Sequence, residues 1–310
     1  MQKKQDTSLI WFRNDLRIHD NLSLANAINS NNRVIALYCF DPRLFEVDQF
    51  GFKKTEKYRA KFLIETVTDL KNNLSQLNIP LFIYTIKPEN CIPDFVENYQ
   101  INHIFLQEEW TQEEVNVFSK VKEKLPEYIQ ISTSYNQFLY HPEDIPFNIE
   151  QLPKVFTEFR KACEKQSAIR PETSLAIEKV NEDTLENPTS IPSLSDLGFE
   201  DFEVHPNLAF PFKGGETEAL KRLEDYFFNT KKLGVYKKTR NGLVGKDFSS
   251  KFSPWLANGS LSAKHIYYQV KRFEKAYFKN DSTYWLIFEL IWRDYFKYVS
   301  LKFGNQIFKI

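Results

Sequence analysis

The sequence has few cysteines, and nothing in their placement suggests a disulfide framework or a metal site. The three of them, Cys39, Cys91 and Cys163, lie far apart, form no CxxC pair and have no histidine nearby at ligand spacing. We expect them to be reduced, buried thiols. The five histidines are scattered too, and neither a zinc-ligand spacing nor a Ser/His/Asp arrangement is readable. The sequence therefore predicts no metal site.

Long apolar runs are missing as well. No segment approaches the length of a membrane span, and the start MQKKQDTSLIWF lacks the long apolar core of a signal peptide. We also find no internal repeat and no low-complexity tract. These observations argue against a membrane protein or a repeat protein and favour a cytoplasmic one.

Aromatic side chains and an uneven charge distribution are the main features of the composition. Of the 310 residues, 42% are hydrophobic and 15% are aromatic, led by 28 Phe, which is high for an ordinary soluble protein. The formal charge is zero, yet residues 230–310 hold 16 Lys and Arg against 5 Asp and Glu. This asymmetry predicts an anionic partner for the C-terminal part.

The first part of the chain alternates strand and helix patterns. Short apolar, β-branched or aromatic runs predict strands at residues 8–12, 34–40, 81–86 and 103–106. Residues 55–77 carry a helical stripe of apolar side chains: Tyr58, Phe62, Ile64, Val67, Leu70, Leu74 and Leu77. Strand, helix, strand is typical of a parallel sheet covered on both faces. We predict an α/β doubly wound parallel-sheet domain over residues 1–134.

Such a domain can bind a nucleotide, but the glycine fingerprint for one is missing. The segment WFRNDLRIHDNLSL after the first strand has arginine and aspartate where glycines would be needed. From residue properties alone, Arg13, Asp15, Arg17 and Asp20 are expected to form a surface ion-pair loop. Asp20 or Asn21 is expected to cap the next helix.

Proline and serine then interrupt the pattern. Residues 135–206 are predicted to be a connector across the surface, with one helical patch at 153–165. Residues 207–310 are predicted to be an all-helical domain. Its three expected helices span residues 213–236, 262–278 and 282–303. A threonine after two glycines, Ser262 and Ser282 are the expected N-caps.

The last predicted helix holds Glu289 and Arg293 inside an aromatic stripe rather than opposite it. The stripe consists of Trp285, Phe288, Trp292 and Phe296. One explanation is an i, i+4 ion pair at the edge of a core. The other is a ring-bearing, hydrogen-bonding ligand, because charges among large aromatics are costly to desolvate without a polar partner.

Residues 239–256, TRNGLVGKDFSSKFSPWL, concentrate hydroxyl groups and positive charge. The contributing side chains are Ser249, Ser250 and Ser253 with Lys246 and Lys251. The stretch is not a P-loop, because an aspartate follows the first lysine. A solvated loop with one capping serine is the alternative, but one cap does not explain three hydroxyls and flanking lysines. The stretch favours a phosphate-bearing ligand.

At this point the sequence resembles the photolyase/cryptochrome family, and more narrowly its DASH-type cryptochromes. The resemblance rests on LIWFRNDLRIHDNLSL, YKKTRNGLVGKDFSSKFSPWLANGSLS and STYWLIFELIWRDYF. These are similar to the family's N-terminal signature, its flavin phosphate segment and its next flavin-contacting helix. The segments TRNG, SSKFSPWLA and LPKVFTEFRK favour the DASH type. The match spans essentially the whole chain in the right order.

The resemblance implies a two-domain photoenzyme, a deoxyribodipyrimidine photo-lyase. It implies FAD in the helical domain, a 5,10-methenyltetrahydrofolate antenna near the α/β domain, and a basic face for DNA carrying pyrimidine dimers, mainly single-stranded. In that family, blue light excites the flavin, an electron passes to a flipped cyclobutane pyrimidine dimer, the ring splits and the electron returns. The protein is expected to be a monomer.

The resemblance also assigns roles to individual residues. For FAD it implies Tyr236, the turn of Ser249, Ser250, Lys251, Phe252 and Ser253, and the helix residues Glu289 and Arg293. For catalysis it implies that Glu289 holds the substrate bases and that Trp292 lines the pocket for the damaged bases. For the antenna it implies Phe40, Asp41 and Glu113.

The sequence departs from the family pattern in length. Family members continue substantially beyond the final KFGNQIFKI, so we expect a helical domain that is incomplete at the C-terminus. Two further hypotheses follow. One is a non-enzymatic blue-light photoreceptor or nucleic-acid binder, and the other is a truncated fragment that does not retain FAD.

Overall fold

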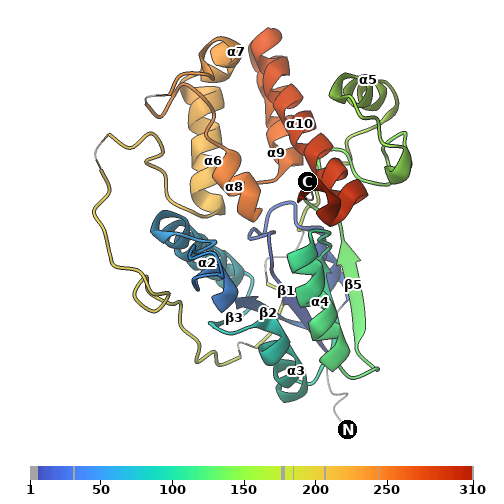
Figure 1. The fold of residues 1–310 in the computed structure, drawn as a ribbon, viewed down its shortest axis with the longest axis vertical. Helices are drawn as coiled ribbons and strands as arrows, with labels where there is room; N and C mark the ends of the chain where they lie inside the picture. Colours follow the sequence, from blue (N-terminus) through green and yellow to red (C-terminus); the bar gives the residue numbers. More distant parts are fainter. Residues whose placement is uncertain are drawn as a thin grey trace.

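A computed structural model describes residues 6–30, 32–175, 179–183, 185–205, 207–243 and 245–308. In Figure 1 an α/β part and a helical part lie one above the other, and a long extended segment runs along one side of both. Among the described residues, no helix is both long and apolar enough to cross a membrane.

The α/β part is built on one parallel sheet, as the sequence predicts. Its strands are β1 (Thr7–Trp11), β2 (Arg33–Cys39), β3 (Leu81–Tyr84), β4 (Ile101–Gln107) and β5 (Gln130–Ser134). The strand order is β3-β2-β1-β4-β5, and every neighbouring pair is parallel. The sequence prediction misses β5, because QISTS is a polar, partly exposed edge strand without an apolar run.

Helices cover both faces of this sheet. They are α1 (Leu22–Asn29) and α2 (Lys57–Gln76) on one face, and α3 (Pro88–Asn98) and α4 (Gln112–Lys124) on the other. The predicted stripe of α2 is correct at Val67, Leu70 and Leu74, which are buried. It is wrong at Tyr58, which is 59% exposed and packs edge-on against Phe202.

The helical part contains short and long helices around a single core. They are α5 (Phe156–Gln166), α6 (Glu216–Glu224), α7 (Tyr236–Thr239), α8 (Ser253–Asn258), α9 (Ala263–Ala276) and α10 (Asp281–Phe303). Ser262 caps α9 as predicted. The other two predicted caps are wrong, because Gly215 precedes α6 and Asn280 caps α10 with a capping box to Thr283.

The predicted connector contributes to the helical core. Phe138, Phe156 and Phe159 are buried in the same cluster as the inner residues of α9 and α10. The Tyr298 hydroxyl, on α10, donates a hydrogen bond to the Tyr140 carbonyl. The division into residues 1–134, 135–206 and 207–310 stays a prediction, but part of the middle segment packs as helical core.

Asp294 fixes the connector to α10 at a buried carboxylate. Its Oδ2 accepts hydrogen bonds of 2.8 Å from the backbone N–H groups of Leu139 and Tyr140. Its Oδ1 accepts no hydrogen bond from the described residues. Burial raises the pKa of Asp294 to about 7, although Arg293 and the two N–H groups oppose this shift. The folded protein therefore holds a proton on Asp294 that the unfolded chain has already released near pH 5.

This pKa gives a testable pH dependence. Because the folded state binds the extra proton, the free energy of unfolding should fall by roughly 2–3 kcal/mol between pH 5 and pH 8 through Asp294 alone. Asp294→Asn keeps an acceptor for both N–H groups and cannot ionise. We therefore expect the free energy of unfolding of this variant to lack the decrease of roughly 2–3 kcal/mol between pH 5 and pH 8. Urea unfolding of both proteins at pH 5 and pH 8 measures the difference. Equal pH slopes would contradict the assignment.

The loop after β1 is a buried junction between the two parts, so the predicted surface ion-pair loop is wrong. Arg17 is 2% exposed and donates hydrogen bonds to the carbonyls of His19, Asp20, Asn136 and Gly259. These acceptors belong to the loop itself, the connector and the α8–α9 turn. The arginine is buried because it satisfies carbonyl groups that the meeting of the parts removes from water.

Further contacts at this junction explain its tight geometry. Asp20, fully buried, accepts hydrogen bonds from Ser262 and from the Thr173 N–H and pairs with Lys264 at 2.8 Å. It is therefore not the cap of α1, whose N-cap is Asn21. At Gly259, φ is +75° and a Cβ atom would lie 1.9 Å from the Asn14 carbonyl oxygen. Only glycine fits this approach of two backbones.

Candidate functional site

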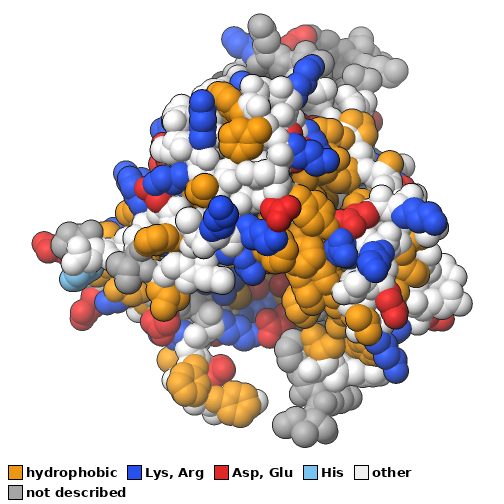
Figure 2. Space-filling view, turned by 90° about the horizontal axis from the view of Figure 1, so that it is seen from above, with side chains coloured by type: hydrophobic (Ala, Val, Ile, Leu, Met, Phe, Trp, Pro, Cys, Tyr) orange, Lys and Arg blue, Asp and Glu red, His pale blue; other side chains and the backbone are white. Residues whose placement is uncertain are grey.

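The aromatic stripe of α10 lies on a partly open face, not in the core. Its inward positions, such as Leu290 and Ile291, are buried, whereas Trp285, Phe288 and Trp292 are partly exposed and Phe296 is 61% exposed. The 3.6-residue repeat puts these two sets on different faces of one helix. Figure 2 shows the end of the molecule where α7, α10 and α5 lie, with a band of hydrophobic side chains bordered by Lys and Arg.

The rings on this face stack on one another. Trp292 lies flat on Phe156 of α5, with ring centroids 3.5 Å apart and planes 14° from parallel. Within α10, Trp292 also stacks with Phe296, at 5.4 Å and 22°. Trp285 and Phe288 form a second stack at 4.7 Å. Parallel rings at such spacing form a surface on which further flat rings can stack.

Cations border the aromatic face on both sides. Lys237 Nζ lies 4.6 Å and the Arg240 guanidinium 5.7 Å from the centroid of the Trp285 ring, both from the α7 side. The Arg160 guanidinium of α5 lies 5.6 Å from the centroid of Phe288. A face with ring stacks and rimming cations suits a ligand that combines flat rings with negative charge.

Glu289 and Arg293 do not form the i, i+4 pair that was one explanation of their placement. Glu289 pairs instead with Arg240 at 2.8 Å. Arg293 donates to the carbonyls of Gln137, at 2.6 Å, and Leu256, at 3.2 Å. Burial lowers the pKa of Arg293, although Asp294 opposes the shift. The two residues therefore lie in different surroundings. Glu289 borders the aromatic face, and Arg293 faces the junction.

Tyr236 lies beside the Glu289–Arg240 pair. It begins α7 and is 7% exposed. Burial, followed by the nearby Glu289 carboxylate, raises its pKa to about 12 against the opposing effect of Arg240. The phenol is thus a neutral group that can donate a hydrogen bond at neutral pH.

The serine turn is organised from within by Arg222, which the sequence reasoning missed. The side chain of Arg222 is 1% exposed and donates to the carbonyls of Lys246, Ser249 and Ser250. It also pairs with Asp247 at 3.0 Å. The five donors of an arginine lie in a rigid planar fork and can hold several carbonyls at once, whereas the three donors of a lysine radiate from a single nitrogen.

This arrangement fits the predicted phosphate ligand. Within the turn, Arg222 bonds only to carbonyl groups. The backbone N–H groups and the hydroxyls of Ser249 and Ser250 donate no hydrogen bond to any of the described residues. Lys251 has φ +63°, which reverses the chain just before Ser253 begins α8. Phe252 is buried and anchors the turn in the core. Free donors on a fixed, cationic turn form an anion cradle.

A cavity of about 370 Å³ adjoins this turn. Its lining includes Val235 and Thr239, on either side of Tyr236, and Lys246 and Asp247 of the loop before the serines. Lys232 of the same lining pairs with Asp247 at 2.6 Å. The α7 region and the loop that leads into the serine turn therefore line the same cavity.

A second cavity, of about 330 Å³, lies at the carboxyl ends of the strands. Residues following β1 and β2, together with α4, line it, including Asp41 and Glu113. Asp41 is held by Arg43 and Glu113 by Lys54. Phe40, in contrast, is fully buried in the sheet core against Tyr38. This is the side of a doubly wound sheet where ligands bind, close to the switch point between β1 and β4.

An α/β sheet with a carboxyl-edge cavity, joined by a buried loop to a helical part with an aromatic, cationic face, is the architecture of the photolyase and cryptochrome class of proteins. The family model described as DNA photolyase matches residues 8–179. The chain belongs to the photolyase/cryptochrome family, as its sequence motifs predict.

The similar proteins include DASH-type cryptochromes. Cryptochrome DASH of Gloeobacter violaceus is 46% identical over 303 residues, which cover 97% of this chain and 60% of the relative. Cryptochrome DASH, chloroplastic/mitochondrial, of Solanum lycopersicum is 40% identical over 326 residues, covering 99% of this chain and 56% of the relative. The chain thus spans less than two thirds of the length of these relatives.

Solved structures agree with this relationship. The Synechocystis cryptochrome has a TM-score of 0.92 at 41% identity, covering all of this chain and 64% of that one. A class III photolyase from Agrobacterium tumefaciens has a TM-score of 0.76 at 19% identity, which is similarity of fold alone. The predicted α/β domain followed by a helical region is confirmed.

Proposed function

We propose that this protein is a blue-light-dependent flavoprotein that splits cyclobutane pyrimidine dimers in DNA, mainly single-stranded DNA, with FAD as its cofactor. The observation that carries the proposal is the aromatic, cationic face of α10, with the donor-rich serine turn held by Arg222 in the same helical part. Family membership and the names of the similar cryptochromes support it.

Each predicted residue takes a role consistent with its surroundings. Ser249, Ser250, Lys251, Phe252 and Ser253 would form the FAD phosphate cradle, with Tyr236 as a neutral donor beside it. Arg293 would act from the junction side, where it is fixed by two carbonyls. When bound, reduced FAD supplies the light-driven electron that opens the cyclobutane ring and is then returned.

The DNA substrate suits the open face. Glu289, 30% exposed at the side chain, would accept hydrogen bonds from the base edges of the dimer, and Trp292 would stack on them. The excess of Lys and Arg after residue 230 would neutralise phosphates. Stacking on aromatic rings binds single strands readily, because their bases are already unpaired. We propose a monomer that acts in the cytoplasm.

The antenna is proposed for the carboxyl-edge cavity. Its cationic side chains include Arg13, Arg43, Arg59 and Lys120, and they would match the negative charge of 5,10-methenyltetrahydrofolate. Asp41 and Glu113 would contact the folate, whereas the Phe40 side chain, buried in the core, would contribute only as support beneath.

The test is a spectrum followed by a repair assay. We expect the purified 310-residue protein to bind near one equivalent of FAD, identified after denaturation, and to remove dimers from a single-stranded oligonucleotide under blue light. At saturating FAD, Glu289→Gln should bind the dimer-containing oligonucleotide at least about tenfold more weakly, because charge-assisted hydrogen bonds are lost. Glu158→Gln, at an exposed position of α5, is the control for the same change of charge.

The outcomes separate the competing hypotheses. Protein that stays colourless after FAD is added would contradict FAD binding and support the fragment hypothesis. Flavin-bound protein that leaves the dimers intact in light would contradict repair and favour the photoreceptor. If the Glu289 and Glu158 variants bind the oligonucleotide with equal affinity, the assignment of Glu289 to the substrate site is contradicted.

A further inference from the structure

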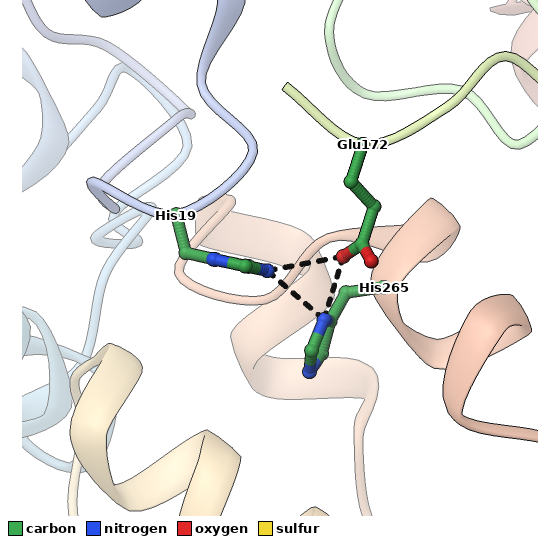
Figure 3. Close-up of side chains that lie close together, drawn as sticks. All are labelled: His19, Glu172 and His265. Carbon is green, nitrogen blue, oxygen red and sulfur yellow. Dashed lines mark hydrogen bonds and ion pairs between the residues drawn. The ribbon is translucent and has the colours of Figure 1, made fainter. Parts of the chain in front are cut away.

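Three potential metal ligands meet at the junction of the two parts (Figure 3). His19 Nε2 lies 3.0 Å from Glu172 Oε1 and 3.0 Å from His265 Nδ1. The third side of the triangle, from His265 Nδ1 to Glu172 Oε1, measures 2.6 Å. His19 belongs to the loop after β1, Glu172 to the connector and His265 to α9, so no local spacing in the sequence announces the cluster.

The shape of this triangle suits a small divalent cation. Two imidazole nitrogens and one carboxylate oxygen are ligands that Zn²⁺ binds at about 2.0–2.2 Å, usually as a tetrahedron. Tetrahedral ligands at that length are about 3.3 Å apart, so two of the three distances need to lengthen by about 0.3 Å and the third, from His265 to Glu172, by about 0.7 Å. The rings already meet edge to face, with centroids 4.6 Å apart and planes at 83°. All three donor atoms point to one place.

Side chains of neighbouring residues hold the backbone of each ligand segment in position. Glu216 accepts hydrogen bonds from the N–H groups of Ile18 and His19, at 2.9 and 2.8 Å. The His265 N–H donates to the capping Ser262 hydroxyl at the start of α9. Lys264 ties the connector to the junction through the Pro171 carbonyl, at 3.0 Å. These fixed supports reduce the cost of bringing the three ligands together.

The cluster is also open to solvent on one side. The exposed fractions of the side chains are 43% for His19, 25% for Glu172 and 11% for His265. A cation can therefore enter, and water can supply the fourth ligand.

We propose that His19, Glu172 and His265 form a binding site for one Zn²⁺ ion that cross-links the α/β part, the connector and the helical part. The site does not depend on the proposed photochemistry. Its role is to stabilise the junction, because a metal that binds only the folded protein raises the free energy of unfolding. This site was not predicted from the sequence, which indicates no metal centre.

Protons compete with Zn²⁺ for the same three side chains. The hydrogen bond to Glu172 raises the pKa of His19 despite the opposing effect of burial. Burial acts to raise the pKa of Glu172, but hydrogen bonds from both histidines outweigh it and lower the pKa to about 2. The other titratable groups facing the cluster are Asp20, Glu216, Lys264 and Tyr268.

The two uses have opposite pH dependence. The His19–Glu172 ion pair is fully present at low pH and is lost as pH rises through the pKa of His19. Zn²⁺ requires neutral imidazoles, so its affinity should rise from pH 6 to pH 8. A metal site and a simple ion pair are therefore distinguishable.

The experiment is a titration of the full 310-residue protein with Zn²⁺ alone at pH 6 and pH 8, by calorimetry and by thermal unfolding. We expect one ion per chain, tighter binding at pH 8 and a higher unfolding temperature with zinc. His19→Gln and His265→Gln should each weaken binding by at least about tenfold, the range lost when even a supporting partner of a metal ligand is removed.

Two controls address other sites on the chain. His205→Gln changes an exposed histidine of the connector and should bind Zn²⁺ as the unchanged protein does. Cys91→Ser removes one of the buried thiols and should also leave binding intact. Loss of zinc in the Cys91 variant would place the ion there and overturn the proposal.

The remaining outcomes are also decisive. No binding at pH 8, or binding that both histidine variants retain, would overturn the site. If a histidine variant fails to fold, Glu172→Gln tests the third ligand with little change of shape. In addition, Co²⁺ in place of Zn²⁺ should show visible absorption bands of a four-coordinate nitrogen and oxygen site, which must disappear in that variant.

Discussion

Arg17→Met is expected to lower the free energy of unfolding by about 4–5 kcal/mol. The side chain of Arg17 donates to four carbonyls, including those of Asn136 and Gly259, at distances of 2.7 to 3.1 Å. Methionine fills a similar volume but donates nothing, so these buried acceptors lose their partner. The positive charge that acts on the buried Asp15 carboxylate is lost at the same time.

Urea unfolding followed by circular dichroism measures this effect. Arg17→Lys keeps the charge, but its single ammonium cannot reach carbonyls of three segments, so we expect about half of the loss. Arg59→Met, at an exposed position of α2, is the matched control and should change stability by less than about 0.5 kcal/mol. If Arg17→Met is as stable as the control, the junction is not held by this residue.

Arg222→Met is expected to have the second large effect, on the serine turn. Arg222 connects Asp225, Asp247 and three carbonyls of the turn while stacking on Phe212 and Tyr226. Removing it leaves Asp225 without its cation and Asp247 with Lys232 alone, and it frees the turn. We expect a loss of about 3–5 kcal/mol in stability and FAD binding that is weaker by at least about tenfold.

The two consequences are measured separately. Near-ultraviolet circular dichroism at low temperature shows whether Arg222→Met is folded, and a flavin fluorescence titration then gives its affinity for FAD. Lys275→Met, an exposed cation on α9, is the control for lost charge. A folded Arg222 variant with unchanged FAD affinity would contradict the role of Arg222 in shaping the cradle, without bearing on the remaining FAD contacts.

Prediction from sequence worked where one element decides the outcome. Four of the five strands, the long helix α10 and the Ser262 cap follow from patterns within a few residues. It failed where two neighbouring residues compete for one cap, and where a partner far along the chain decides. Ser282 was a plausible cap, but Asn280 lies two residues earlier and completes a capping box with Thr283. One of the two explanations for Glu289 pairs it with Arg293, four residues away, whereas its partner is Arg240, at the end of α7.

The candidate site divides in the same way. The aromatic stripe, the serine turn and the residues assigned by resemblance could all be named from the sequence, because motifs are local. Arg222 could not, since its helix pattern gives no sign that its guanidinium is 1% exposed. The cluster of His19, Glu172 and His265 was equally hidden, because its members are 153, 93 and 246 residues apart.

The sequence by itself determined the class of fold, the order of its parts and the family, because hydrophobic periodicity and long motifs are properties of contiguous residues. Only the tertiary structure decided that the charged loop after β1 is a buried junction. A loop of arginine and aspartate belongs on the surface unless other segments supply partners for every charge. Here the connector, α8 and α9 supply them for Arg17 and Asp20, and those partners come together only once the chain has folded.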